Sequence, residues 1–546
     1  MSEQITIFSA RRIYTMSPHQ PTATHIAVRN RRVLGTGTFA ELAGRGDHKL
    51  DETLKDKILL PGFVEGHCHI MEGGLWKYPY VGYYPRHGPD GTRHEACRSI
   101  DDTIAFLCEI SSDMEDEHAP LIAWGFDPIF FGDQRMNRQH LDQVSRTRPV
   151  LVLHASVHLC NVNSVVLEQA GIDRDTDVDG VVKDANGAPT GELQEPAAMF
   201  PAFEVTGADF FHCGEDPVSV RNLAAVARQV GVTTATDLLA DCSDAMVENY
   251  ARESADEQLP LRLVPALAGL DLSVDEGLRR LSAARQKNTD KLHFGLVKLF
   301  TDGSIQGFTA RLTSPGYYNG APNGLWMTSP DQLCELVAGY HRAGCTLHIH
   351  ANGDEASALA LDAISRALDA FPRIDHRHTL QHCQVAPVEQ YRRMQSLGVC
   401  VNLFANHLYF WGDQHVEKTL GAARAHKMNA SATALSHGIP LAIHSDAPIT
   451  PLAPLFTAWC AVNRRTATGR VLGESERISV AQAMYAITSG AAYTLRMDHL
   501  IGSLEPGKFA DMAVLDDDPF ESSPEQLKDI TVWGTVVGGR LFAANA

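Results

Sequence analysis

The feature that most constrains this chain is a pair of histidines that directly follows a short buried strand. Ile58-Leu59-Leu60 reads as the end of that strand. The chain then continues through Pro61-Gly62-Phe63-Val64-Glu65-Gly66 to His67-Cys68-His69. On an extended backbone, side chains two residues apart point to the same side. A strand tip of this kind can present two imidazoles to one metal ion, so we expect partner ligands elsewhere in the chain.

Between residues 61 and 490, apolar strand-like runs alternate with helix-like stretches such as 217–230, 330–343, 354–370 and 388–397. This alternation predicts βα units around a parallel sheet. Gly231, Gly344 and Gly398 each fall between a helix pattern and a strand, where a helix C-cap is expected. The predicted strands are 121–124, 150–153, 233–236, 261–265, 294–300, 346–350, 378–381, 400–402 and 441–444.

The predicted strands outnumber the eight of a barrel, so we assign some of them to an insertion at about 72–210. That stretch is rich in Gly, Pro and Tyr and has weak periodicity. Both ends of the chain read as short strands, and the N-terminal segment is too short for a large core of its own. We therefore expect residues 1–60 and 491–546 to form one small β-sandwich domain beside an α/β domain over 61–490.

Composition argues against several classes of protein. The 546-residue chain has a formal net charge of -19, which disfavours a nucleic-acid partner, because phosphate contacts need a basic face. No run of about 18 apolar residues predicts a membrane span. The eleven cysteines form no CxxC pair, and no basic segment followed by an apolar one opens the chain. We expect reduced cysteines and a cytoplasmic location; a homo-oligomer stays open.

Side chains that suit a metal ion recur at the predicted strand ends. Lys298 lies within an apolar run, and His350, His382 and Asp446 come at the ends of later strands. Parallel barrels keep their sites at the carboxyl ends of the strands. Imidazole and carboxylate groups suit zinc and similar divalent ions.

Each of these residues has an ordinary structural explanation when it is taken alone. A single buried histidine such as His382, His154 or His158 is usually a hydrogen-bonded core residue. Lys298 can extend its amine to solvent, and Asp446 can cap a turn. The joint pattern is more informative, because HxH, Lys, His, His and Asp follow one another in this order, each at a predicted strand end.

In this joint pattern the chain resembles the amidohydrolase superfamily, whose members are metal-dependent hydrolases on a TIM-type (β/α)8 barrel. The branch it resembles most includes N-substituted formamide deformylase. The likeness covers nearly the whole chain, including a stretch around His158 that is similar to part of that branch's insertion. It is carried by residues 60–69, 298–304, 350–354, 381–382, 445–448, 502–515 and 154–163.

The resemblance implies a metal centre of one or two ions, most simply zinc. One ion would be held near the first strand and a second near the fifth and sixth strands, with a lysine between them. The implied ligands are His67, His69, Lys298, His350, His382 and Asp446.

The resemblance also implies that Lys298 is carboxylated on its amine by carbon dioxide. An ammonium group cannot bind a metal, whereas a carbamate is an anion with two oxygens, and a desolvated lysine is needed to form it. A single-ion site without this bridge stays open. So do the roles of His348 and His444, which lie two residues before His350 and Asp446.

The reaction implied by the resemblance is hydrolysis of an amide-type carbon–nitrogen bond by a metal-activated water. Asp446 would accept the proton, and His158 or the metal would polarise the carbonyl. Two aromatic groups fit either ordinary packing or an apolar pocket for a small-molecule N-substituted formamide or related aryl or alkyl amide. Arg311 fits a structural arginine or a carboxylate anchor. The aromatic residues are Trp76, Tyr78, Tyr80, Tyr83 and Tyr84, then Phe404, His407, Tyr409, Phe410 and Trp411.

Two other functions stay open. One is a mononuclear deaminase of an amino-heterocycle, in which Lys298 would have no bridging role. The other is a catalytically inactive barrel that acts as a regulatory or binding protein. Retention of all the candidate ligands favours an enzyme. Metal analysis separates the enzymes from the binding protein, which would hold no metal. A Lys298→Ala variant separates the deaminase, which would keep its metal and activity.

Overall fold

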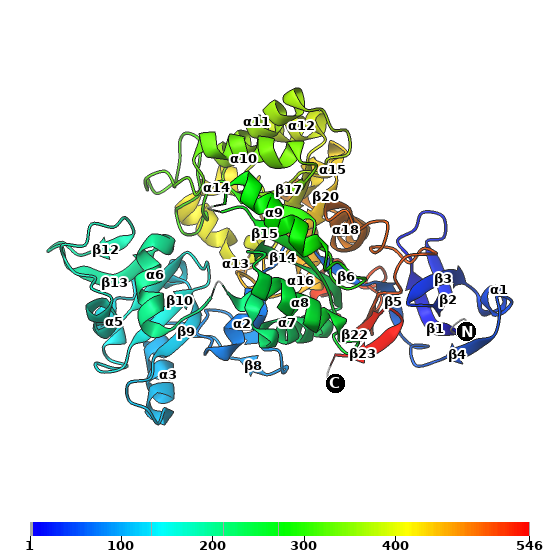
Figure 1. Ribbon diagram of the computed structural model, residues 1–546, viewed down its shortest axis with the longest axis horizontal. Helices are drawn as coiled ribbons and strands as arrows, with labels where there is room; N and C mark the ends of the chain where they lie inside the picture. Colours follow the sequence, from blue (N-terminus) through cyan, green and yellow to red (C-terminus); the bar gives the residue numbers. More distant parts are fainter. Residues whose placement is uncertain (1–3, 133, 211, 271, 545–546) are drawn as a thin grey trace. The chain divides into compact units, whose positions relative to one another are not determined.

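The computed structural model describes residues 4–132, 134–210, 212–270 and 272–544 (Figure 1). The chain forms two compact units. One contains the stretches up to Ile70 and from Gly214 onward, and the other is Met71–Cys213. Within the described ranges, every helix is too short or too polar to cross a membrane.

An eight-stranded parallel sheet forms the centre of the first unit. Its strands lie in chain order, each pairing in parallel with the next. Beyond the strand ends, Cys68 and Ala447 form a parallel bridge, so the first and last strands meet at their carboxyl ends. The predicted TIM-like α/β fold is confirmed. The strands are β6 (Phe63–Glu65), β14 (Val232–Ala240), β15 (Arg262–Ala268), β16 (Leu296–Phe300), β17 (Thr346–Ala351), β18 (Thr379–His382), β19 (Cys400–Leu403) and β20 (Leu441–Ile443).

Some of the helices between these strands begin or end at a residue that caps them. Helix α10 (Pro330–Arg342) follows Ser329, whose side chain accepts a hydrogen bond from the Gln332 amide. Helix α12 (Val388–Leu397) ends at Gly398, whose φ of 69° suits glycine. The other helices of this unit are α1 (Phe39–Ala43), α7 (Pro217–Gln229), α8 (Asp244–Ala255), α9 (Val274–Arg285), α11 (Asp354–Ala370), α13 (His407–Gln414), α14 (Gly421–Ala425), α15 (Ser431–Ser436), α16 (Pro454–Asn463), α17 (Val480–Tyr485) and α18 (Ala491–Thr494).

The two ends of the chain form a separate mixed sheet in the order β23-β22-β21-β5-β1-β2-β3, with β4 beside β1. Strand β5 pairs antiparallel with β21, so N-terminal and C-terminal segments share one sheet, as the sequence predicted. In Figure 1 these are the blue and red strands. The strands are β1 (Ile5–Tyr14), β2 (Thr22–Arg29), β3 (Arg32–Gly37), β4 (His48–Asp51), β5 (Ile58–Pro61), β21 (Met512–Leu515), β22 (Val532–Val537) and β23 (Arg540–Ala543).

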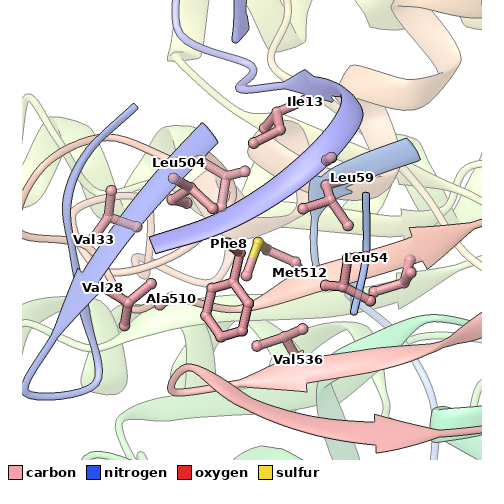
Figure 2. Close-up of a cluster of buried hydrophobic side chains, with 13 residues drawn as sticks. Phe8, Ile13, Val28, Val33, Leu54, Leu59, Leu504, Ala510, Met512 and Val536 are labelled. Atoms are coloured by element: carbon pink, nitrogen blue, oxygen red, sulfur yellow. The ribbon is translucent and has the colours of Figure 1, made fainter. Parts of the chain in front are cut away.

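One cluster of buried side chains stabilises this terminal sheet (Figure 2). Phe8 and Val28 come from the N-terminal strands, whereas Met512 and Val536 come from the C-terminal strands. Burying a side chain of this size contributes about 1.5–3 kcal/mol. Because the cluster draws on both ends of the chain, neither end can form this core alone.

Gly62 leads the chain from the terminal sheet into the barrel. Its amide donates a hydrogen bond to the Asp511 carbonyl at 2.9 Å. A Cβ at this position would lie 1.9 Å from Oγ1 of Thr233. Glycine therefore allows the chain to approach β14 closely at the start of β6, which places His67 at the carboxyl end of that strand.

The unit Met71–Cys213 has a mixed sheet of its own, in the order β12-β13-β11-β10-β9. The strands predicted at 121–124 and 150–153 belong to this sheet, and the predicted insertion at about 72–210 falls in this stretch. The predicted domain boundaries at residues 60 and 490 stay predictions. The elements are β7 (Arg86–His87), β8 (Arg93–His94), β9 (Leu121–Phe126), β10 (Val150–His154), β11 (Leu159–Val162), β12 (Val181–Lys183), β13 (Pro189–Gln194), α2 (Met71–Gly74), α3 (Ile100–Asp113), α4 (Arg138–Leu141), α5 (Ser164–Gln169) and α6 (Glu195–Thr206).

Candidate metal centre

All six predicted metal ligands lie on strands of the parallel sheet or just beyond them. Three belong to strands and three follow one, and adjacent strands bring their side chains together at the carboxyl edge of the sheet. In chain order, they are His67 and His69 after β6, Lys298 in β16, His350 in β17, His382 at the end of β18 and Asp446 after β20.

The first group of contacts joins His67, His69, Lys298 and Asp446. Oδ1 of Asp446 lies 3.2 Å from Nε2 of His67 and 3.3 Å from Nε2 of His69. Nζ of Lys298 lies 3.2 Å from Nε2 of His67. Two ligand atoms about 2.0–2.2 Å from one ion lie about 3.3 Å apart in a tetrahedral site, so the spacing of His67, His69 and Asp446 suits a divalent ion.

The second group joins His350, His382 and Asp446. Nε2 of His382 lies 3.0 Å from Nδ1 of His350, and Nδ1 of His382 lies 3.7 Å from Oδ2 of Asp446. Among the described residues, neither Nδ1 of His382 nor Oδ1 of Asp446 has a hydrogen-bond partner, although both atoms are buried. Unpaired buried polar atoms are costly, so a cation between them would remove the cost.

Two of these residues adopt a left-handed backbone conformation. The φ angle is 71° at His382 and 56° at Asp446. Such conformations cost about 1–3 kcal/mol each in residues other than glycine and gather at functional sites. The strained backbone therefore lies at the end of β18 and just beyond β20, where these two side chains reach the other candidate ligands.

Burial shapes the charges of the centre. It lowers the pKa of Lys298 to about 7. Burial alone disfavours the ionised form of Asp446, but the rings of His67, His69 and His382 hold its pKa well below the usual value. Burial, and then the charge of Lys298, lower the pKa of His67, which keeps its imidazole neutral.

The loop after β17 is held by a buried carboxylate. Asp302 accepts hydrogen bonds from the backbone amides of Asn352, Gly353 and Arg311, each at 2.9 Å, and burial raises its pKa to about 7. A Cβ on Gly353 would lie 1.7 Å from the Arg311 carbonyl oxygen. The Asn352 side chain in turn contacts Nε2 of His350 at 3.1 Å, so this loop sets the orientation of a predicted ligand.

Arg311 has a structural role. Its guanidinium pairs with Glu355 at 2.9 Å, donates to the Gly324 carbonyl at 2.9 Å and lies over the Trp326 ring. These contacts match the structural interpretation of Arg311 and use the groups that a substrate carboxylate would need.

His158 lies in the unit Met71–Cys213. Its Nδ1 is 3.1 Å from Oε2 of Glu195, and its carbonyl accepts a hydrogen bond from the Glu195 amide. Val157, directly before it, has a φ of 63°, and Glu195 has a φ of 62°. The structure thus holds His158 with Glu195 on strained backbone, while its predicted action on the substrate carbonyl stays a prediction.

Two further residues at the centre were not predicted as part of it. His444 is buried, its ring stacks on that of His67 at 4.5 Å, and it can share an ion with His67 and His382. Glu65 is buried and accepts hydrogen bonds from the Ser445 hydroxyl at 2.9 Å and from the backbone amides of His67 and Ser445. The available signal for Glu65 was a carboxylate in an otherwise apolar strand, and burial raises its pKa to about 8.

The second aromatic group borders this centre. The Phe404 ring stacks on His444 at 4.9 Å and lies 5.8 Å from the ring of His382. The Phe404 ring also contacts those of His407, at 4.7 Å, and Trp411, at 6.4 Å. The first aromatic group packs within its own unit, where Tyr80 contacts Trp124. The Phe404 ring is buried, so it packs as an apolar group against the candidate ligand His382 and against His444.

Comparison with known proteins identifies the family of this chain. The protein LONG AFTER FAR-RED 3 of Arabidopsis thaliana is 28% identical over 550 residues, covering 97% of this chain and 90% of that protein. N-substituted formamide deformylase of Arthrobacter pascens is 25% identical over 552 residues, with 97% and 96% covered. An uncharacterised metal-dependent hydrolase from Pyrococcus horikoshii OT3 shares the fold, with a TM-score of 0.71 at 20% identity over 95% of this chain and 99% of that one. The sequence pattern of the amidohydrolase family matches residues 53–543, and the chain therefore belongs to the amidohydrolase family.

Proposed function

We propose that this protein is a metal-dependent hydrolase that cleaves the carbon–nitrogen bond of a small amide. The observation that carries the proposal is the convergence of His67, His69 and Asp446, with interatomic distances of 3.2 and 3.3 Å at one strand edge of the barrel. A divalent ion in such a site, zinc by the chemistry of these donors, acts as a Lewis acid and makes hydroxide available near neutral pH.

Lys298 would complete the centre as a carbamate. Its side chain is fully buried, and its amine lies 3.2 Å from Nε2 of His67. Lys298 faces His348 in the register of β16 with β17, two residues before the pair of Phe300 and His350. As a carbamate, Lys298 would supply an anionic ligand with two oxygens, which is the chemistry that a centre of two ions would use.

Asp446 would move the proton. Its carboxylate accepts a proton from the attacking water and passes it to the leaving nitrogen. Glu65 holds the neighbouring Ser445 by a hydrogen bond of 2.9 Å and so fixes the backbone that carries Asp446. His158, oriented by Glu195, would polarise the substrate carbonyl.

The proposed substrates are N-substituted formamides or related aryl or alkyl amides. Phe404 supports this class, because its buried ring makes the surroundings of His382 and His444 apolar. The relative from Arthrobacter pascens that is named N-substituted formamide deformylase supports the formamide group.

A substrate panel tests the proposal. Zinc-loaded protein is assayed with N-alkyl and N-aryl formamides, the matching acetamides and a set of amino-heterocycles. We expect release of amine and formate from the formamides. Release of ammonia from the heterocycles would instead indicate a deaminase, and no turnover of any compound by metal-loaded protein would contradict an enzyme of either kind.

The Asp446→Asn variant tests the proton transfer. We expect the variant protein that holds metal to lose at least about tenfold in turnover, because an amide is a poor proton acceptor. The matched control is Asp362→Asn, which alters an exposed ion pair between α11 and α12. A loss of less than tenfold in Asp446→Asn with metal retained would assign the proton transfer to another group.

A further inference from the structure

A chain of hydrogen bonds runs from His67 to the backbone. Nδ1 of His67 lies 2.7 Å from Oε1 of Gln381, and Nε2 of Gln381 lies 2.6 Å from Nδ1 of His348. Nε2 of His348 lies 3.2 Å from the carbonyl oxygen of Thr494, the last residue of α18. All three side chains are buried, with at most 1% of their surface exposed.

The final contact gives the chain a direction. A carbonyl oxygen only accepts hydrogen bonds, so Nε2 of His348 carries its proton. A neutral imidazole has one N–H, so Nδ1 of His348 accepts, and the Gln381 amide donates to it. Gln381 then presents its oxygen to His67, which must donate from Nδ1. The remaining nitrogen of neutral His67, Nε2, carries no proton and keeps its lone pair.

That lone pair faces the candidate metal position. Nε2 of His67 lies 3.2 Å from Oδ1 of Asp446 and 3.2 Å from Nζ of Lys298. Only an unprotonated ring nitrogen can bind a metal ion. If the Gln381 amide were reversed, its nitrogen would donate to Nδ1 of His67, and the proton of the neutral ring would sit on Nε2.

We propose that Gln381 and His348 are positioning residues that fix the proton of His67 on Nδ1 and thereby make Nε2 a metal ligand. The inference rests on the proposed function, because it requires a metal at this site. It assigns His348 a place outside the ligand set, although this residue shares a strand face with the predicted ligand His350. The Thr494 carbonyl is the fixed end of the chain.

Two substitutions of Gln381 distinguish the effect of its hydrogen-bond direction from the effect of its side-chain packing. Gln381→Met keeps the length of the side chain and removes both hydrogen bonds, and we expect its zinc dissociation constant to rise about 10-fold to 100-fold. Gln381→Glu still accepts from His67 and cannot donate to it. We expect its dissociation constant to stay within about threefold of the wild type, because carboxylate–histidine–metal arrangements support binding.

A rescue experiment tests the direction of the hydrogen bonds between His348, Gln381 and His67. In His348→Leu the Gln381 amide is free to reverse, so we expect zinc binding to weaken by about tenfold. Adding Gln381→Glu should restore it, because a carboxylate can only accept from His67. A packing role predicts the opposite, since the double variant buries a carboxylate beside leucine. Weaker zinc binding in the double variant than in His348→Leu would overturn the inference.

The readouts are zinc affinity by competition with a chromophoric chelator, zinc per chain, and thermal unfolding of the metal-free protein. The matched control is Gln390→Met, which removes another buried glutamine whose amide donates to the Asp354 carbonyl. If the wild type binds no zinc, the proposed function fails. If the wild type binds zinc and the dissociation constant of Gln381→Met stays within twofold of the wild-type value, the inferred role of Gln381 and His348 fails while the proposed function stands.

Discussion

Lys298 shows at the scale of one residue how this barrel departs from ordinary packing. A lysine normally extends its amine to solvent, but this one is fully buried, with its amine 5.0 Å from the Phe300 ring and 3.2 Å from Nε2 of His67. Burial lowers its pKa to about 7, so much of the amine is neutral near neutral pH. The neutral amine is the form that reacts with carbon dioxide.

The Lys298→Met variant tests the bridging role. We expect it to lose bound metal and turnover, because methionine keeps the volume and cannot form an anionic ligand. In the wild type, native mass spectrometry should detect a carbon dioxide adduct that disappears on acidification. Lys291→Met is the control, since Lys291 donates to the backbone carbonyls of Asp256 and Leu259. Full metal content and activity in Lys298→Met would favour the mononuclear deaminase alternative.

The placement of the candidate ligands at strand ends was predictable from their order along the chain, while their binding of metal stays a prediction. The partners of those ligands were less predictable. Gln381 and His348 act through ring orientation and a backbone carbonyl of α18, and none of these follows from spacing. Glu65 and Ser445 lie 380 positions apart in sequence and meet only because β6 and β20 are neighbours around the barrel.

At the scale of elements, the loop between β17 and α11 depends on a close backbone approach. In Gly353→Ala the new methyl group would collide with the Arg311 carbonyl oxygen. That oxygen cannot move without breaking the hydrogen bond from the Arg311 backbone amide to Asp302. We expect a loss of about 1–3 kcal/mol in unfolding free energy and weaker metal binding through His350. Thermal unfolding and zinc titration measure the two effects.

Gly295→Ala is the matched control for this prediction. Gly295 lies just before β16, and a Cβ there would have only the Arg285 side chain nearby, at 4.0 Å. Its unfolding temperature and zinc affinity should match the wild type. Equal behaviour of the two glycine variants would show that the loop tolerates a side chain at residue 353.

Elements with strong local signals were predicted well. Helices α11 and α12 have the predicted limits, because apolar periodicity and the Gly398 cap act within a few residues. The strands at 121–124 and 150–153 were also predicted, but their sheet was not. Local pattern indicates a strand, whereas its partners depend on contacts between segments farther apart in the chain, such as β9 with β10 and β11 with β13.

At the scale of the whole molecule, a buried ion pair ties the barrel to the returning end of the chain. Arg262 of β15 forms two hydrogen bonds with Asp511, at 2.5 and 3.0 Å, and both side chains are 3% exposed. Asp511→Ala would leave a buried guanidinium without its counter-ion. We expect a loss of about 3–5 kcal/mol, measured by urea unfolding.

The control for this ion pair is Asp516→Ala. Asp516 pairs with Lys57 at 2.7 Å, but these side chains are 36% and 25% exposed. We expect a loss below about 1 kcal/mol. A similar loss in the two variants would mean that the Arg262–Asp511 pair contributes no more than a surface pair.

Stability should also depend on pH through a histidine cluster that precedes strand β18 and includes a residue of α10. His341 and His378 lie 2.8 Å apart, His376 accepts from the His378 amide at 2.9 Å, and burial lowers the pKa of each, with a smaller effect from Arg373. The unfolded state takes up protons below about pH 6.5, whereas the folded cluster takes them up only at lower pH. Stability is therefore full above that pH and falls as the pH drops below it.

Replacing His341 by Phe should make this fall less steep. Each proton taken up only by the unfolded state contributes at most about 1.4 kcal/mol per pH unit. The slope of unfolding free energy between pH 6.5 and 5 should decrease by up to that amount in the variant. Identical slopes would show that His341 titrates alike in the folded and unfolded states.

The most direct test of the metal centre is a crystal structure of the zinc-loaded protein with data collected at the zinc absorption edge. We predict anomalous density between His67, His69 and Asp446, and a second peak beside His350 and His382 with a carboxylated Lys298 between the two. The absence of anomalous density within coordination distance of these six residues in zinc-saturated crystals would contradict the account.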